Sequence, residues 1–396
     1  IGFKMRANMT THQMFEPMYG SIILEMVSDS PAGMLLGETT KEYTFESCGE
    51  KLDMAELQEI WESKLEPVYP YRKAGSAVEK INGSLTAPAA PKIGVAKPKV
   101  IIPVFPGTNC EYDTAKAFAR AGADPEILVI RNLTPADVAE SCEALVKAID
   151  ASQIVMLPGG FSGGDEPDGS AKFIASFFRS PAVTEAVRDL LQHRDGLMLG
   201  ICNGFQALIK LGLVPYGDIR PITAYDPTLT FNTIGRHQSM LVRTRVASTG
   251  SPWLSHCDAG SEYEIAISHG EGRFVCSQTL LNQLIDNGQI ATQYVDLTCQ
   301  PTMDLRYNPN GSVMAIEGIT SPDGKKVWAI GTDYLRKAFF LSTYGIYRTQ
   351  IISDGWTGRA WNEETEAYDS DYHASLSASI AKRKAFCGNL YSCNIL

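Results

Sequence analysis

Short apolar runs alternate with helical stretches between residues 98 and 215, and this alternation constrains the fold more than any other feature of the chain. The run Val100–Phe105 ends at Pro106-Gly107, and comparable runs begin at Glu126, Ile154 and Gly196, with helical stretches between them. Strands connected through helices lie parallel, with helices on both faces of the sheet. The sequence therefore predicts an α/β domain built on a doubly wound parallel sheet.

Composition divides the rest of the chain. An apolar run at Ser21–Met26 and a helical run that Asp53 is placed to cap indicate a smaller α+β segment at the N-terminus. A stretch rich in Ala, Pro, Gly and Lys follows, which is typical of a linker. We therefore expect four segments: an N-terminal part over 1–72, a linker over 73–97, the α/β domain over 98–330 and an atypical tail over 331–396.

The charge balance and the cysteine content exclude several classes of protein. Lys and Arg total 35 and Asp and Glu total 45, so the net charge is −10 and no basic stripe is present for nucleic acid. No apolar stretch reaches the roughly 18 residues that span a bilayer. Nine scattered cysteines without zinc-ligand spacing argue against a disulfide scaffold and favour a reducing cytoplasm. The residues that follow Ile1 are typical of sequence from the middle of a longer chain. We therefore expect a fragment or a processed product, with an artificially trimmed chain as the alternative.

The most informative motif is Gly200-Ile-Cys-Asn-Gly204, between an apolar run and a helical stretch. A Gly-x-Cys-x-Gly sequence in that context is the cysteine form of the nucleophile elbow, in which a tight turn raises the nucleophile above the sheet. The following helix directs its N-terminus at the sulfur and favours thiolate. The sequence therefore predicts Cys202 as a nucleophile and the Asn203 amide as an oxyanion donor, with a buried structural cysteine as the alternative.

Two further segments carry candidate site residues. Gly159 and Gly160 follow the apolar run that starts at Ile154, and we interpret their amides as the second half of an oxyanion hole, with a plain loop as the alternative. His269 and Glu271 follow a shorter run and have the residue types of a base and its orienting carboxylate. They fit equally well a turn whose polar groups satisfy each other.

Five motifs between 98 and 330 resemble the glutamine amidotransferase domain of phosphoribosylformylglycinamidine synthase, in the order found in that family. The motifs are Phe105–Glu111, Pro158–Asp168, Gly200–Gln206, Ser268–Arg273 and Asn308–Ser312. Residues 1–72 are more weakly similar to the end of the synthetase portion of the large, fused form of that enzyme, through the runs Phe15–Ser21 and Leu65–Pro70.

The resemblance implies a class I glutamine amidotransferase of purine biosynthesis. Cys202 would attack the side-chain amide of glutamine and form a γ-glutamyl thioester, with Gly159, Gly160 and Asn203 holding the oxyanion. The released ammonia would pass to a synthetase domain, on the same full-length chain or on a partner subunit, where ATP and Mg drive amidation of formylglycinamide ribonucleotide. This chain contains no phosphate-binding loop and no metal-ligand cluster, so we expect no cofactor or metal in the fragment itself.

The sequence departs from the family after Ile330. The resemblance implies a later His-x-Glu motif that supplies the base and its carboxylate, but no His lies between His269 and His373. A reading-frame slip near codon 331 explains this loss, with real divergence as the alternative. Three functions therefore stay open: an impaired amidotransferase, a cysteine hydrolase that uses His269 and Glu271, and a non-catalytic domain that docks on a synthetase.

Overall fold

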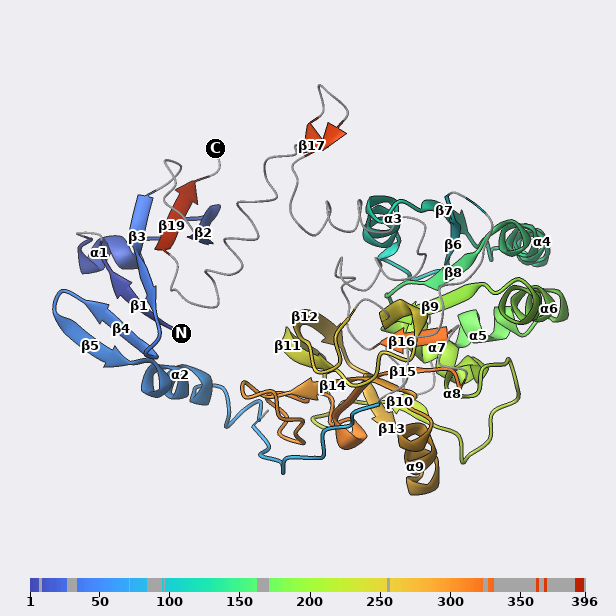
Figure 1. The fold of residues 1–396 in the computed structure, drawn as a ribbon. Coiled ribbons are helices and arrows are strands. Elements are labelled where there is room, and N and C mark those ends of the chain that lie inside the picture. Colours follow the sequence, from blue (N-terminus) through green and yellow to red (C-terminus); the bar gives the residue numbers. More distant parts are fainter. Residues whose placement is uncertain are drawn as a thin grey trace. The chain divides into compact units, whose positions relative to one another are not determined.

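The computed structural model describes two compact units of the chain (Figure 1). The residues described are 1–6, 9–26, 34–70, 72–83, 95, 97–161, 171–254, 257–322, 327–330, 361–362, 367–368 and 389–394. One unit comprises residues 1–70 and 357–396, and the other comprises residues 71–356. Most of the expected tail, including the point of departure after Ile330, lies outside the described residues.

The first unit is an α+β segment, as the sequence predicts for its N-terminal part. Its strands lie in the order β2 (Ser21–Met26), β19 (Asn389–Asn394), β3 (Met34–Thr40), β1 (Gly2–Met5), β4 (Thr44–Ser47) and β5 (Glu50–Asp53). Its helices are α1 (Thr11–Phe15) and α2 (Met54–Ser63). Asp53 caps α2 as expected, because its carboxylate accepts a hydrogen bond from the Ala55 amide at 2.7 Å. A two-strand ladder, β17 (Trp361–Asn362) with β18 (Ala367–Tyr368), is also described.

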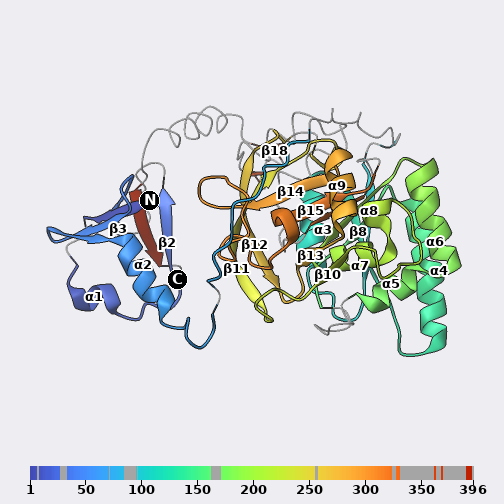
Figure 2. The ribbon, with the colours of Figure 1, turned by 90° about the horizontal axis from the view of Figure 1, so that it is seen from below.

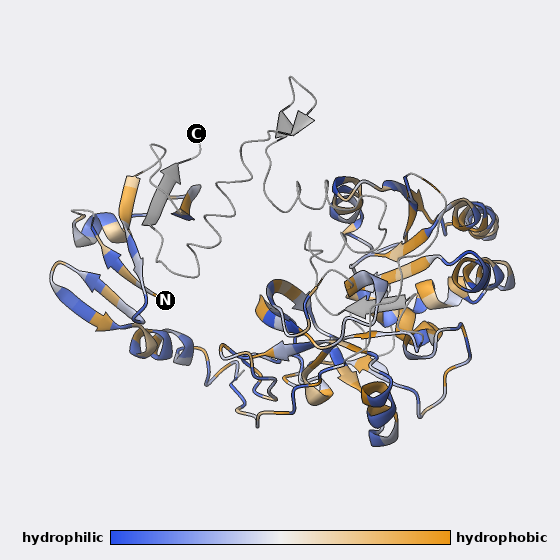
Figure 3. Cartoon of the chain, viewed as in Figure 1, coloured by the Kyte–Doolittle hydropathy of each residue, from blue (hydrophilic) through white to orange (hydrophobic). Residues whose placement is uncertain are grey.

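The second unit is built on one large sheet, and Figure 3 colours its strands β8 and β9 as largely hydrophobic. The described strands follow the order β12 (Glu262–His269), β11 (Gln238–Val246), β14 (Ile290–Val295), β15 (Ile316–Thr320), β16 (Val327–Ile330), β9 (Leu197–Ile201), β8 (Ile154–Leu157), β6 (Lys99–Val104) and β7 (Asp124–Val129). A separate short ladder joins β10 (Thr228–Thr230) to β13 (Arg273–Val275).

Strands β16, β9, β8, β6 and β7 are parallel, which confirms the predicted parallel sheet. The sheet then continues through β15, β14, β11 and β12, and each of these strands pairs antiparallel with its neighbour. The expectation of a parallel sheet therefore describes only part of it. The sequence beyond residue 215 has shorter apolar runs, and short connections between such runs favour antiparallel pairing.

Helices cover both faces of the parallel strands (Figures 1 and 2). The helices of this unit are α3 (Glu111–Arg120), α4 (Pro135–Ala151), α5 (Lys172–Phe178), α6 (Pro181–Arg188), α7 (Asn203–Leu211), α8 (Leu213–Tyr216) and α9 (Gln278–Asp286). Alternate residues of one strand enter different cores: Ile101 packs with residues of α4 to α7, whereas Val100 and Ile102 pack with Phe118 of α3. This alternation is the signature of a strand that is buried on both faces.

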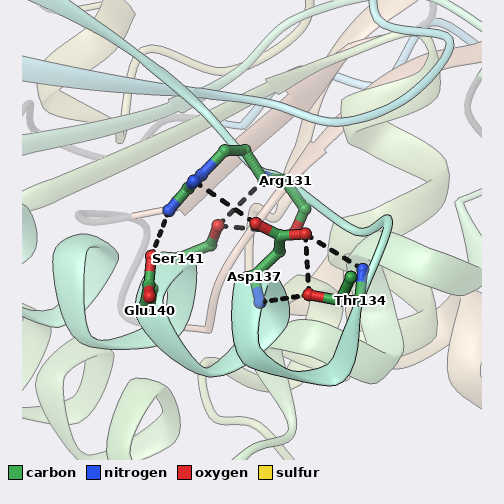
Figure 4. A network of polar contacts seen from close by, with 5 residues as sticks. All are labelled: Arg131, Thr134, Asp137, Glu140 and Ser141. Carbon is green, nitrogen blue, oxygen red and sulfur yellow. Dashed lines mark hydrogen bonds and ion pairs between the residues drawn. The ribbon is translucent and has the colours of Figure 1, made fainter.

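The turn between β7 and α4 is fixed by a polar network (Figure 4). Thr134 and Asp137 form a reciprocal capping box, in which each side chain accepts from the other residue's backbone amide, at 3.1 and 3.0 Å. Arg131 forms ion pairs with Asp137 and Glu140, and its amide donates to Ser141 Oγ at 3.0 Å. These contacts fix where α4 begins at the carboxyl edge of the sheet.

Part of the expected linker lies along the second unit as an extended strap. The Val78 amide donates to the Pro301 carbonyl and the Gly83 amide to the Ala247 carbonyl, both at 2.8 Å. Ile81 is buried, and its carbonyl accepts a hydrogen bond from the buried Arg245 guanidinium at 2.7 Å. Residues 73–83 of the expected linker therefore contribute to the core of this unit, which linker composition alone does not predict.

Candidate active site

The nucleophile elbow forms as the sequence predicts. Strand β9 ends at Ile201 and α7 begins at Asn203, so Cys202 is the single residue between strand and helix. Its backbone has φ 51° and ψ −102°, in a region that residues with a Cβ atom rarely adopt. Such backbone strain concentrates at functional sites. The half-buried Cys202 stands at the carboxyl end of a central parallel strand, at the N-terminus of α7.

Both flanking glycines are required by close packing. A Cβ atom on Gly200 would lie 2.5 Å from the Leu208 side chain and 2.7 Å from the Gly204 carbonyl oxygen. A Cβ atom on Gly204 would overlap the Leu157 carbonyl oxygen at the end of β8. The first turn of α7 therefore lies directly against the neighbouring strand, which holds the elbow in its strained conformation.

Gly204→Ala is expected to destabilise the second unit by at least about 2 kcal/mol, because the added methyl group meets backbone that cannot move aside. Chemical denaturation of the variant measures this loss. Gly159→Ala is the matched control, since its added methyl group meets no atom closer than 3.4 Å, and its cost should stay below about 1 kcal/mol. Equal stability of the two variants would contradict this account of the elbow.

Three loops meet at the carboxyl edge of the sheet, after β6, β8 and β9. The loop after β8 pairs with the loop after β6 through a bridge between Gly160 and Thr108, and the Phe161 amide donates to the Gly107 carbonyl at 2.8 Å. Gly160 has φ +154°, and a Cβ atom there would lie 2.6 Å from the Gly107 oxygen. Only glycine fits where the two loops cross. The glycine is therefore needed whether the loop after β8 is a plain loop or part of an oxyanion hole.

Gly159 lies between two cysteines. A Cβ atom built on it would be 3.4 Å from Cys110 Sγ and 3.6 Å from Cys202 Cβ. The backbone of the loop after β8 is therefore adjacent to the Cys202 side chain, as the oxyanion-hole interpretation of Gly159 requires. Asn203, the other expected donor, is buried in the first turn of α7.

A cavity of about 450 Å³ opens beside Cys202. Its lining residues come from α3, from loops at the carboxyl edge and from β12: Asn109, Cys110, Asp113, Thr114, Lys116, Ala117, Arg120, Gly160, Phe161, Cys202 and Ser268. Helices α3 and α7 both begin at this cavity, after Cys110 and Cys202 respectively. Two helix N-termini and the basic side chains of Lys116 and Arg120 favour negative charge on a sulfur or an oxyanion there, whereas the Asp113 carboxylate opposes it.

A chain of side-chain hydrogen bonds connects the elbow to the segment Ser268–Arg273. Asn203 Nδ2 donates to Gln206 Oε1 at 2.8 Å, and Gln206 Nε2 donates to the Glu271 carbonyl oxygen at 2.9 Å. Both amide side chains are buried. No sequence motif predicts a role for Gln206, although its position four residues after Cys202 places it one turn along the same helix.

His269 and Glu271 are buried near this connection but do not line the cavity. His269 shares the buried face of β12 with Ile265 and Ile267, whereas the adjacent Ser268 lies on the other face and lines the cavity. The His269 ring lies against Gly272, where a Cβ atom would overlap it. Burial lowers the pKa of His269 to about 4. The structure therefore brings Cys202, Gly160 and Ser268 together and leaves the expected dyad in the core.

The burial of His269 predicts a pH-dependent stability. Its folded pKa is depressed, so the unfolded state binds more protons between about pH 6.5 and pH 4, and stability falls as the pH falls through that window. We expect a loss of about 2 kcal/mol between pH 7.5 and pH 5 from this group. Denaturation at both pH values checks this, with His269→Gln as the control that removes the loss. The same pH dependence in both proteins would contradict it.

The described residues contain no group of three or more His, Cys, Asp or Glu side chains arranged to hold a metal ion. None of the described helices has the length and apolar character needed to cross a membrane.

The comparison with protein families identifies the class of protein. Residues 97–331 match the family of CobB/CobQ-like glutamine amidotransferase domains, which is more than half of the chain. The matched segment contains the elbow and all three loops at the carboxyl edge. The chain belongs to this family.

The chain is also similar to individual members of this class. The chain is 32% identical over 232 residues to the phosphoribosylformylglycinamidine synthase subunit PurQ of Methanococcus maripaludis, covering 58% of this chain and 78% of that subunit. It is 34% identical over 224 residues to the same subunit of Symbiobacterium thermophilum, covering 56% and 80%. These matches leave a large part of the present chain without a counterpart.

Two solved structures are similar at lower identity. The structure of PurLQS from Thermotoga maritima matches with a TM-score of 0.43 and 21% identity, covering 73% of this chain and 99% of that one. The glutaminase domain of the Trypanosoma brucei CTPS with bound acivicin matches with a TM-score of 0.37 and 11% identity, covering 63% and 94%.

Proposed function

We propose that the second unit is the glutaminase component of a phosphoribosylformylglycinamidine synthase, and that Cys202 is its nucleophile. The observation that carries this proposal is the strained elbow that presents Cys202 to the cavity between α3 and the loop after β8. The names of the relatives support the substrate glutamine and the synthase reaction.

In the proposed reaction the Cys202 thiolate attacks the side-chain amide carbon of glutamine, and a carbon–sulfur bond forms. The carbonyl oxygen becomes an oxyanion, which the amides of Gly159, Gly160 and Asn203 are placed to hold. Fixed donors of this kind typically contribute about 3 to 4 kcal/mol of transition-state stabilisation each. The amide nitrogen takes up a proton, the carbon–nitrogen bond breaks and ammonia leaves, and water then hydrolyses the γ-glutamyl thioester to glutamate and free Cys202 thiol.

Two steps of this cycle need a proton-transfer group, namely ammonia departure and thioester hydrolysis. The described lining of the cavity contains one carboxylate, that of Asp113, and no imidazole. The sequence after Ile330 also lacks the His-x-Glu motif that the family resemblance implies. We therefore propose an impaired glutaminase in which both steps are slow and thioester hydrolysis is the slower of the two.

The remaining parts of the proposal concern the longer enzyme. Residues 1–72 would be the end of a synthetase portion, and the full synthase reaction would need the rest of that portion with ATP and Mg, in the cytoplasm. Exposed aromatic side chains in this segment, such as Tyr19 and Trp61, support burial of its surface against further protein. The same exposure favours the second candidate function, a non-catalytic domain that docks on a synthetase.

Protection of Cys202 from alkylation tests the proposed substrate. Glutamine at millimolar concentration should slow the reaction of iodoacetamide with Cys202, whereas asparagine, which is one methylene shorter, should not. Mass spectrometry of the peptide Asp195–Lys210 gives the rate. Cys48, which is exposed in the first unit, is the internal control. Equal rates with and without glutamine would contradict the proposal, and turnover of esters or peptides instead would favour the hydrolase alternative.

A further inference from the structure

Two cysteines from different loops line the cavity of the candidate active site. Cys110 immediately precedes α3 in the loop after β6, and Cys202 immediately precedes α7 in the loop after β9. Strand β8 lies between β6 and β9 in the sheet, so the two cysteines approach each other across the loop that follows β8. The proposed reaction uses Cys202 and assigns no role to Cys110.

The residue between the two cysteines is Gly159, and its lack of a side chain leaves the space between them open. A Cβ atom at Gly159 would lie 3.4 Å from Cys110 Sγ, 3.9 Å from Cys110 Cβ and 3.6 Å from Cys202 Cβ. Both cysteine side chains therefore border the volume that one methyl group would fill, and their Cβ atoms lie at most 7.5 Å apart. A disulfide needs Cβ atoms about 3.5 to 4.5 Å apart, so it forms when the loops after β6 and β9 move toward each other.

Groups that attract negative charge lie beside the two cysteines, although the Cys110 thiol also donates a hydrogen bond to Asn109 Oδ1 at 3.1 Å. The N-termini of α3 and α7 and the basic residues Lys116 and Arg120 lie at the same cavity. By contrast, burial raises the pKa of the Cys276 thiol to about 11 and also raises the pKa of Cys257. Oxidation follows thiolate character and accessibility, so it should begin at this cavity.

We propose that Cys110 is a resolving cysteine that captures oxidised Cys202 in a reversible disulfide. With hydrogen peroxide as the oxidant, the Cys202 thiolate attacks one peroxide oxygen, the oxygen–oxygen bond breaks, hydroxide leaves and the sulfur becomes a sulfenic acid. The Cys110 thiolate then attacks that sulfur, the sulfur–sulfur bond forms and the sulfur–oxygen bond breaks. With the two protons released by the thiols, the products are one disulfide and two waters.

The disulfide would switch off the nucleophile and protect it from irreversible oxidation. A sulfenic acid without a nearby thiol proceeds to sulfinic acid, which thiol reductants do not reverse. This consequence for activity rests on the proposed function of Cys202, but the formation of the disulfide does not. A crosslink measurement therefore tests the redox pair separately from glutamine chemistry.

Peptide mapping of the peroxide-treated full chain tests the pair directly. Dilute protein is oxidised, blocked with N-ethylmaleimide and digested with trypsin without reductant. We expect a crosslink between the peptides Val100–Lys116 and Asp195–Lys210, each of which contains one cysteine, and its loss on treatment with dithiothreitol. Sulfinic acid on Cys202 without this crosslink, or crosslinks that join Cys202 equally to other cysteines, would overturn the proposal.

Two variants with small steric changes sharpen the test. In Cys110→Ser, peroxide should inactivate the Cys202 thiol irreversibly, so dithiothreitol no longer restores its alkylation. In Gly159→Ala, the added methyl group fills the space between the cysteines at ordinary contact distance, and the crosslink yield should fall sharply. Cys142→Ser, a change in α4 away from the cavity lining, is the control and should crosslink as the parent chain does. Full recovery of Cys202 in Cys110→Ser would also overturn the proposal.

Discussion

Replacing Cys202 by alanine is expected to abolish covalent labelling of the chain by a glutamine-like electrophile such as a diazoketone analogue of glutamine. The parent chain should be labelled at Cys202 ahead of the other eight cysteines, because this sulfur stands at a helix N-terminus in an open cavity. The expected effect is a complete loss of labelling at low reagent concentration.

Peptide mapping after labelling checks this prediction, and Cys276→Ala serves as a control that should label like the parent chain. Cys110 is the most demanding comparison, since it lines the same cavity at the start of α3. Labelling of Cys110 or Cys48 before Cys202, with Cys202 inert, would contradict the assignment of the nucleophile.

Glutaminase turnover by the isolated chain is expected to be about 10²- to 10⁴-fold slower than that of an intact relative, the range that one general acid–base group contributes. The His-x-Glu pair implied by the resemblance is missing, but a base and its orienting carboxylate act as a unit, so their combined loss costs about as much as loss of the base alone. The rate of ammonia release is measured for this chain and, under the same conditions, for the PurQ subunit of one of its relatives, and the ratio of the two rates gives the loss.

The variant His269→Ala tests whether His269 replaces the missing general base. The His269 ring lies on the core side of β12 and does not line the cavity, so the variant should leave the residual turnover within a few-fold of the parent value. A further loss of 10²-fold or more would show that His269 moves into the role of the base. If the parent chain turned over at about 1 s⁻¹ or faster, and His269→Ala left that rate unchanged, the prediction that the chain lacks a general base would be wrong.

The parallel part of the fold was predictable because its signals are local. The strand Ile154–Leu157 begins at the predicted residue, and the capping of α2 by Asp53 depends on residues adjacent in sequence. The antiparallel extension from β15 to β12 was not predicted, since strand direction depends on connections and partners that short apolar runs do not specify. The strap at residues 73–83 was interpreted as linker because its few apolar residues, such as Ile81, find their partners far along the chain.

In the candidate site too, the features set by local sequence were predictable and those set by distant contacts were not. The elbow at Cys202 was predictable because the glycines that it needs lie within two residues of the nucleophile. The approach of Cys110 to Gly159 depends on how the loops after β6 and β8 cross, and no sequence spacing reports it. His269 has the residue type of a base, but the alternation of side chains along β12 places it on the buried face, and that register is set by pairing with β11.

Detection of a γ-glutamyl thioester on Cys202 is the most direct test that this residue is the nucleophile of a glutamine amidotransferase. The chain is incubated with glutamine, quenched in acid and digested, and the peptide Asp195–Lys210 is examined by mass spectrometry. Because thioester hydrolysis lacks its base, the adduct should accumulate on this peptide, disappear on treatment with hydroxylamine and be absent from Cys202→Ala. An unmodified Asp195–Lys210 peptide after prolonged incubation with saturating glutamine, in a chain that still folds, would contradict the assignment of Cys202 as the nucleophile of a glutamine amidotransferase.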